Sequence, residues 1–183
     1  MRVITGTARG RRLKEPKGME TRPTSDQVKE SLFNILQFDI EGRRVLDLFA
    51  GTGQLGIEAL SRGAAHATFV DARRDAIALV RENLSLCHLT DRSACVTGDA
   101  LSFLASAGTQ FDLIFLDPPY DGDLLEKAME RIANLDILAP YGMMVAECRA
   151  DKSLPPLPPP YGVSRDYRYG KIKLTVCKRE GDA

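Results

Sequence analysis

The chain has 183 residues, of which 44% are hydrophobic, and its formal net charge is zero. This length and composition predict one compact domain with a full core, and no apolar run approaches the length of a membrane span. Residues 1–29 hold eight basic and three acidic side chains, a net charge of +5, so the rest of the chain carries −5. A basic segment ahead of a mildly acidic body indicates an anionic partner bound at one end, although a solvated polar arm explains the same charges.

The cysteines and histidines show no metal-binding or disulfide pattern. None of the four cysteines has C-x-x-C spacing, and all lie in apolar runs: Cys87, Cys95, Cys148 and Cys177. We expect reduced core cysteines, as in a cytoplasmic protein. His66 and His88 are isolated, so no metal site is predicted. The first residues lack the apolar core of a signal peptide, which agrees with a cytoplasmic location.

The N-terminal segment predicts a small extension ahead of the main domain. The turn "GTARG" between "VIT" and "RRLKEP" indicates a short β-hairpin over residues 2–14. After a loop, residues 24–38 have helical spacing, with Val28, Leu32, Ile35 and Leu36 on one face and a capping box between Thr24 and Gln27. We therefore divide the chain into a basic arm, residues 1–23, and a main domain, residues 24–183.

From Arg44 onward, strands and helices alternate. Apolar runs predict strands over 44–49, 67–71, 94–98, 111–117 and 142–148, and helical patterns follow the first four over 54–62, 73–87, 100–107 and 123–134. Near-continuous apolar strands joined by helices indicate a parallel sheet covered on both faces. After the proline-rich connection "LPPLPPPYG", residues 162–179 read as an antiparallel hairpin turning at Tyr169-Gly170. The fold class is thus α/β, Rossmann-like, with a mostly parallel seven-stranded sheet and an antiparallel finish.

A glycine loop follows the first strand of this alternating region. Gly51, Gly53 and Gly56 form G-x-G-x-x-G between a strand and a helix, and Asp71 ends the next strand. Glycine permits a sharp turn with a ligand against bare backbone, and the acid can accept hydrogen bonds from ribose hydroxyls. This combination predicts a cofactor that contains adenosine, but it fits both a nicotinamide dinucleotide and S-adenosylmethionine (SAM). A turn that only connects the two elements is the alternative.

Two further acids favour SAM. Asp47, near the end of the first strand, can face the cationic amino group of a methionine moiety, whereas a pyrophosphate gains nothing from it. Asp99 follows the third strand and can accept a hydrogen bond from the adenine amino group, with Ala100 next to it in the cofactor site. Each acid also has a structural alternative, because Asp47 can cap the loop and Asp99 can be the N-cap of the next helix.

These features, together with "DPPY" at 117–120, resemble class I SAM-dependent methyltransferases, whose amino-methylating motif is D/N/S-P-P-Y/F/W. The segments "RVITGTARGRRL", "TRPTSDQVKESLFNIL", "DLFAGTGQLGIEALSRGA" and "YGKIKL" extend the resemblance over nearly the whole chain to the RsmD family of bacterial 16S rRNA guanine-N2 methyltransferases. The resemblance implies SAM as cofactor and 16S rRNA as partner, within an assembling small ribosomal subunit.

The "DPPY" residues suit an exocyclic amine, a poor nucleophile whose lone pair is delocalised into the ring. Asp117 and the Pro118 carbonyl can accept the two amine hydrogens, which leaves the lone pair directed at the methyl group. Pro118 and Pro119 fix φ, and Tyr120 offers a face for stacking of a splayed-out base. We expect direct transfer without a metal or a covalent intermediate. A tight turn with an N-cap-like acid is the alternative interpretation.

The basic arm then has a role, because its cations can contact the phosphates of structured RNA: Arg9, Arg11, Arg12, Lys14 and Arg22. Three other functions remain as alternatives. An adenine-N6 methyltransferase of RNA or DNA shares the chemistry, a nicotinamide-dependent oxidoreductase shares the glycine loop, and a non-catalytic RNA-binding module shares the fold. We expect a monomer.

Overall fold

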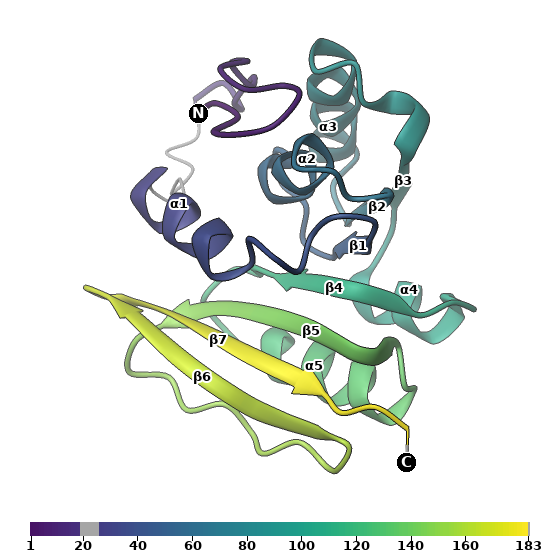
Figure 1. Ribbon diagram of the computed structural model, residues 1–183, viewed down its shortest axis with the longest axis vertical. Helices are drawn as coiled ribbons and strands as arrows, with labels where there is room; N and C mark the ends of the chain where they lie inside the picture. Colours follow the sequence, from purple (N-terminus) through teal and green to yellow (C-terminus); the bar gives the residue numbers. More distant parts are fainter. Residues whose placement is uncertain (19–25, 183) are drawn as a thin grey trace.

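The computed structural model of the protein describes residues 1–18 and 26–182. A seven-stranded sheet runs through it in the order β3-β2-β1-β4-β5-β7-β6 (Figure 1). The first five strands pair in parallel and β7 pairs antiparallel with both neighbours. The strands are β1 (Arg44–Asp47), β2 (His66–Asp71), β3 (Ser93–Thr97), β4 (Phe111–Leu116), β5 (Leu138–Arg149), β6 (Tyr161–Tyr169) and β7 (Ile172–Arg179). The predicted α/β class and the predicted antiparallel hairpin at the end of the chain are confirmed.

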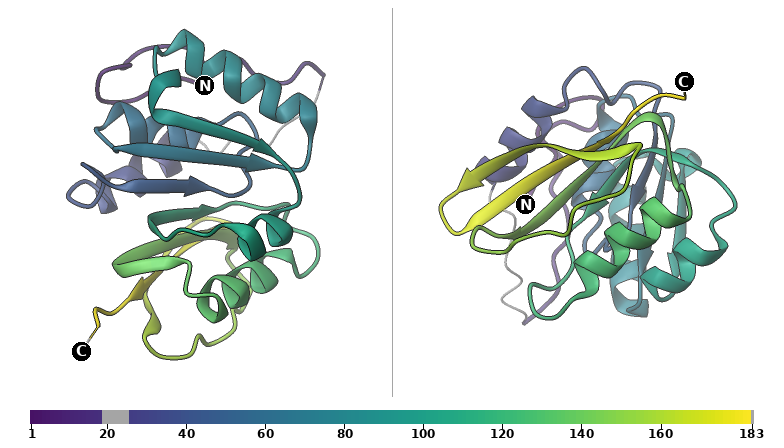
Figure 2. Two further views of the ribbon diagram at one scale, coloured as in Figure 1. Left: turned by 90° about the vertical axis from the view of Figure 1, so that its right-hand side faces the viewer. Right: turned by 90° about the horizontal axis from the view of Figure 1, so that it is seen from below.

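Helices cover both faces of the sheet. They are α1 (Asp26–Ile35), α2 (Gln54–Ser61), α3 (Arg74–Leu86), α4 (Ala100–Ser106) and α5 (Leu124–Asn134), with a short 3₁₀ turn over Thr90–Arg92. Apolar residues of α1, α2 and α3 share one core cluster, and those of α4 and α5 share the other. Figure 2 shows α4 and α5 together against one face of the sheet. No helix in the described residues is long and apolar enough to cross a membrane.

Alternation along the strands decides which face each side chain meets. On β4, Leu113 and Phe115 belong to the first core, whereas Ile114 and Leu116 belong to the second. On β5, Met143 and Val145 again face the first core. The continuous apolar runs of these strands follow from this two-sided burial, as expected for parallel sheets.

The N-terminal arm folds back on α2. A bridge between Arg2 and Arg12 confirms the antiparallel turn of the predicted hairpin, although no ladder forms there. The backbone amides of Ile4 and Thr5 donate to the Glu58 carboxylate of α2 at 2.8 and 3.0 Å. Three apolar residues of the arm, Val3, Ala8 and Leu13, are buried in the first core.

A buried ion pair holds this corner together. Lys29 of α1 and Glu58 are both 0% exposed, with 3.2 Å between Nζ and the carboxylate. The ammonium also donates to the Arg2 carbonyl at 2.9 Å. Lys29 was counted in the positive charge of the N-terminal segment, but here its charge is compensated inside the protein. The division into an arm and a main domain stays a prediction.

Some predicted boundaries differ from the structure. Helix α1 ends at Ile35, although Leu36 is still buried, and β5 begins at Leu138 rather than at 142. The predicted capping box involves Thr24, which lies outside the described residues. All four cysteines are free, with Cys95 half-buried and the others buried, which agrees with the prediction of reduced core cysteines.

Candidate active site

Five carboxylates lie along one edge of the sheet. In spatial order from β3 to β5 they are Asp99, Asp71, Asp47, Asp117 and Glu147. The four aspartates lie at or just after the carboxyl ends of their strands, and Glu147 lies within β5, two residues before its end. Ligands of open α/β sheets bind at this edge. The strand order therefore brings together acids that are up to a hundred residues apart in the chain.

Four of these acids line one cavity of about 540 Å³: Asp71, Asp99, Asp117 and Glu147. Gly51, Ala100, Pro118, Pro119 and Tyr120 line it as well. A second cavity of about 160 Å³ contains Asp47 and shares Gly51 and Asp117 with the first. The predicted cofactor residues and the predicted catalytic residues thus meet in one place, except for Gly53, which is not among the residues that line these two cavities.

The three glycines of the glycine loop have different structural roles. Gly51 has φ +56°, its amide donates to Asp71 Oδ2 at 3.0 Å, and a Cβ built on it meets no described atom within 4 Å. Gly53 has φ +80° and is the N-cap residue of α2. Gly56 packs directly on the Phe69 ring, where a Cβ would clash. Only Gly51 leaves open space for a ligand, whereas Gly53 and Gly56 shape the turn and the packing of α2 on the sheet.

Asp71 and Asp99 are held by backbone amides. Asp71 accepts hydrogen bonds from Gly51 N and from Arg73 N, at 3.0 and 2.9 Å. Asp99 Oδ2 accepts from Ser102 N at 2.8 Å, so the alternative role as N-cap of α4 is confirmed. Hydrogen bonds from Ser102 lower the pKa of Asp99. A carboxylate has about four lone-pair positions, so both acids can accept further hydrogen bonds from a ligand.

Asp47 differs from the other acids because it is deeply buried. Only 2% of its surface is exposed, and Oδ2 accepts a hydrogen bond from Gly56 N at 3.1 Å. This contact confirms that Asp47 also supports the start of α2. Burial raises the pKa of Asp47 to about 7, and the charge of Asp71 adds to the effect. A cationic group of a ligand would stabilise the charged form of Asp47, whereas a phosphate would destabilise it.

This set of donors and acceptors fits SAM rather than a dinucleotide. Carboxylates accept hydrogen bonds from hydroxyl, amino and ammonium groups, all of which SAM carries. A pyrophosphate beside Asp47 would meet a like charge, and the repulsion would cost binding free energy. The electrostatics of the cavity thus argue against the oxidoreductase alternative.

The "DPPY" segment leaves the sheet directly after β4. Its Tyr120 hydroxyl donates a hydrogen bond to Glu147 Oε1 at 2.6 Å. Glu147 lies on β5, is 6% exposed and lines the same cavity. Our sequence analysis missed this residue. An acid inside the apolar run "MMVAEC" was the signal that could have revealed it, because the four preceding strands also end in acids.

The basic residues predicted to contact RNA lie on the arm beside this site. Arg9, Arg11, Arg12 and Lys14 are exposed, and Arg22 lies outside the described residues. Lys14 forms an ion pair with Glu82 of α3 at 2.9 Å. Such exposed pairs contribute little, about 0–1 kcal/mol, so Lys14 can exchange this partner for a phosphate.

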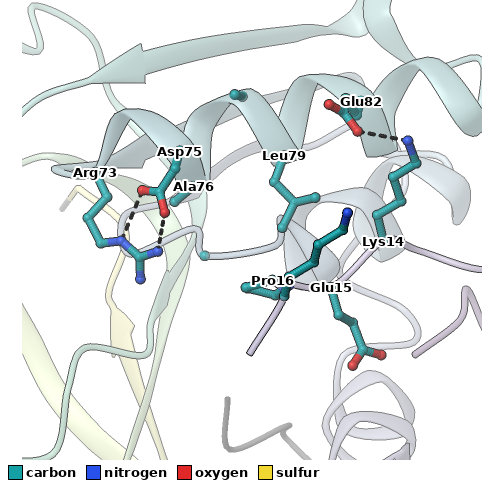
Figure 3. Close-up of a pocket in the computed structure, with 11 residues that line it drawn as sticks. Lys14, Glu15, Pro16, Arg73, Asp75, Ala76, Leu79 and Glu82 are labelled. Atoms are coloured by element: carbon teal, nitrogen blue, oxygen red, sulfur yellow. Dashed lines mark hydrogen bonds and ion pairs between the residues drawn. The ribbon is translucent and has the colours of Figure 1, made fainter. Parts of the chain in front are cut away.

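A groove of about 680 Å³ separates the arm from α3, and Figure 3 shows Lys14 and Glu82 at one end and Arg73 and Asp75 at the other. Arg73 also lines both cavities of the site, a role the sequence analysis did not assign to it.

The strand order, the antiparallel β7 and the carboxylates at the carboxyl edge define a class I SAM-dependent methyltransferase fold. The family model "Conserved hypothetical protein 95" matches residues 1–178. The chain belongs to this family, which is the RsmD family of the sequence analysis.

Named relatives and a solved structure agree with this assignment. The Escherichia coli (strain K12) protein named "Ribosomal RNA small subunit methyltransferase D" is 36% identical and covers 98% of this chain and 90% of its own length. YlbH from Bacillus subtilis is 42% identical, over 99% of this chain and all of its own. The solved structure of yhhF from Escherichia coli superposes with a TM-score of 0.89 at 36% identity, over 100% of this chain and 99% of that one.

Proposed function

We propose that the protein transfers the methyl group of SAM to the exocyclic N2 amine of a guanine in small-subunit rRNA. The observation that carries this proposal is the single cavity in which Asp117, Pro118 and Tyr120 face Asp71 and Asp99. The name of the Escherichia coli relative supports small-subunit rRNA as the substrate. Guanine-N2 is the position that the family resemblance implies.

The residues of the cavity have separate tasks in this reaction. SAM supplies an electrophilic methyl group on a sulfonium. Asp71 and Asp99 would hold its ribose and adenine, and Asp47 would face its amino group. Asp117 and the Pro118 carbonyl would accept the two hydrogens of the target amine, and Asp117 would take the proton once the nitrogen becomes cationic.

Tyr120 supports the target base. Stacking of a base on an aromatic ring contributes about 1–3 kcal/mol in single-stranded nucleic acid recognition. The hydrogen bond from the Tyr120 hydroxyl to Glu147 holds the far end of the ring in position before any base arrives. A ring held in place loses less rotational freedom on binding, so more of the stacking energy goes into orienting the amine.

The exposed cations of the arm supply affinity for the rRNA. Arg9, Arg11, Arg12 and Lys14 would contact phosphates, because the arm lies beside the groove that leads to Gly51. Arg22 belongs to the same proposal. An assembling small subunit is the proposed substrate, bound by a monomer of this chain without a metal.

The test is methyl transfer from labelled SAM to unmodified small subunits, to naked 16S rRNA and to duplex DNA. We expect N2-methylguanosine from the subunits, identified by digestion and mass spectrometry. N6-methyladenine in RNA or DNA would overturn the proposed substrate while keeping the chemistry.

The variant Asp117→Ala tests the catalytic assignment. We expect the transfer rate to fall by about 10²–10³, the range for loss of one preorganised group at a reacting centre, while SAM affinity stays within twofold of wild type. Asp121→Asn is the matched control, because Asp121 is exposed four residues further on. An unchanged rate in Asp117→Ala would contradict the role of Asp117.

A further inference from the structure

Glu147 occupies a position in the cavity that the proposed chemistry does not yet use. Leu116 of β4 and Ala146 of β5 are register partners, so Asp117 and Glu147 are the next residues on neighbouring strands. Both line the cavity of about 540 Å³, and Tyr120 hydrogen bonds to Glu147. The carboxylate therefore lies beside the residues that grip the target amine.

A carboxylate at this position can do more than hold Tyr120. Burial of a charged group costs far more free energy than burial of a neutral one, and Glu147 is 6% exposed. A neutral glutamine oxygen could also accept the Tyr120 hydroxyl, in a weaker hydrogen bond. The carboxylate offers four lone-pair positions, so it can accept the Tyr120 hydrogen and a hydrogen from a ligand together.

The chemistry of the purines indicates which ligand hydrogen Glu147 could accept. In guanine the N2 amine is flanked by N1–H, a hydrogen-bond donor. In adenine the N6 amine is flanked by an N1 without hydrogen, an acceptor. A carboxylate beside Asp117 and the Pro118 carbonyl therefore attracts N1–H of guanine and repels N1 of adenine. The "DPPY" segment by itself binds the amine of either base.

We propose that Glu147 accepts a hydrogen bond from N1–H of the target guanine while it holds Tyr120, and so makes the site specific for guanine. This inference rests on the proposed function, because it assumes that N2 of guanine is the methylated atom. Glu147 is then both a specificity-determining residue for the base and a positioning residue for the Tyr120 ring.

The test replaces the target guanosine, in reconstituted small subunits, by 2,6-diaminopurine riboside. This base keeps the 2-amino group, but its N1 carries no hydrogen. We expect wild type to methylate guanine at least about tenfold faster, because a hydrogen bond to a charged group is lost with the analogue. In Glu147→Gln the preference should fall below about threefold, because the amide can turn its N–H toward the N1 acceptor.

Tyr120→Phe is the matched control, because it removes the hydroxyl that contacts Glu147 but leaves the carboxylate. It should lower the rate on both substrates and keep the preference for guanine. In the Tyr120→Phe background, Glu147→Gln should still abolish the preference, which a role limited to holding Tyr120 would not do. SAM affinity, measured by calorimetry, should be unchanged in all variants. An unchanged affinity shows that each variant is folded.

The outcomes separate the two proposals. Equal rates of wild type on guanine and 2,6-diaminopurine, or an undiminished preference in Glu147→Gln, would overturn the inference about Glu147 alone. Absence of N2-methylguanosine from unmodified subunits would overturn the proposed function and this inference with it.

Discussion

The buried Asp47 carboxyl predicts an unusual pH dependence of stability. Burial raises its pKa from 3.8 to about 7 in the folded protein. A raised pKa means that the folded state binds the proton more tightly than the unfolded state does. The contribution to stability is therefore complete below about pH 4 and is lost as the pH rises to about 7.

The magnitude follows from this shift and is tested with Asp47→Asn. A change from 3.8 to about 7 is about 3 pKa units, which corresponds to about 4 kcal/mol. Asparagine resembles the protonated acid and cannot ionise, so it avoids this loss. The variant's advantage over wild type in free energy of unfolding should grow by about 1.4 kcal/mol per pH unit and level off near pH 7.

Urea unfolding of ligand-free protein at fixed pH steps from 5 to 8 measures this difference. The exposed Asp91→Asn is the matched control, and its difference from wild type should stay flat. A constant difference between Asp47→Asn and wild type would refute the reasoning. If Asp47 faces the SAM amino group, the wild-type affinity for SAM should also rise with pH toward 7, and that of Asp47→Asn should not.

Three further variants test other parts of the molecule. Arg11→Gln with Arg12→Gln should reduce the slope of log affinity against log salt for rRNA by roughly 1–2, and an unchanged slope in filter binding would contradict phosphate contacts. Gly56→Ala forces a methyl group against the Phe69 ring, so urea unfolding should show a loss of about 1–3 kcal/mol. Glu58→Gln leaves a buried ammonium uncompensated and should cost about 3–5 kcal/mol. Limited proteolysis should then cut the arm, and an arm as resistant as in wild type would count against this anchor.

The alternating part of the fold could be predicted because its signals are local. Each strand of the parallel region is a short apolar run, and each following helix has its own periodicity. The acids at the strand ends were predictable for a related reason. In a parallel sheet all carboxyl ends meet at one edge, so the positions of Asp47, Asp71 and Asp99 along the chain already implied their proximity in space.

Features that depend on tertiary contacts were not predictable in this way. The start of β5 at Leu138 crosses Pro140 and Tyr141, and Tyr141 has φ +60°, so its sequence reads as a loop. The Lys29–Glu58 pair joins residues that look like solvated helix positions. Glu147 looked like an interruption of an apolar strand, and its contact with Tyr120 depends on the folding of the chain after β4.

The row of carboxylates also bears on the direction of the proposed reaction. Neighbouring strands lie about 4.8 Å apart, so acids on successive strand ends repel one another. Burial and the charge of Asp71 already raise the pKa of Asp47 to about 7. A cationic ligand relieves this repulsion, and a neutral one does not. Because methyl transfer converts the sulfonium of SAM into a neutral thioether, the carboxylates lose part of their attraction to the ligand when the reaction is complete. The product keeps the ammonium group that would face Asp47 but has lost the sulfonium charge, so the electrostatics of the cavity favour the reactant over the product.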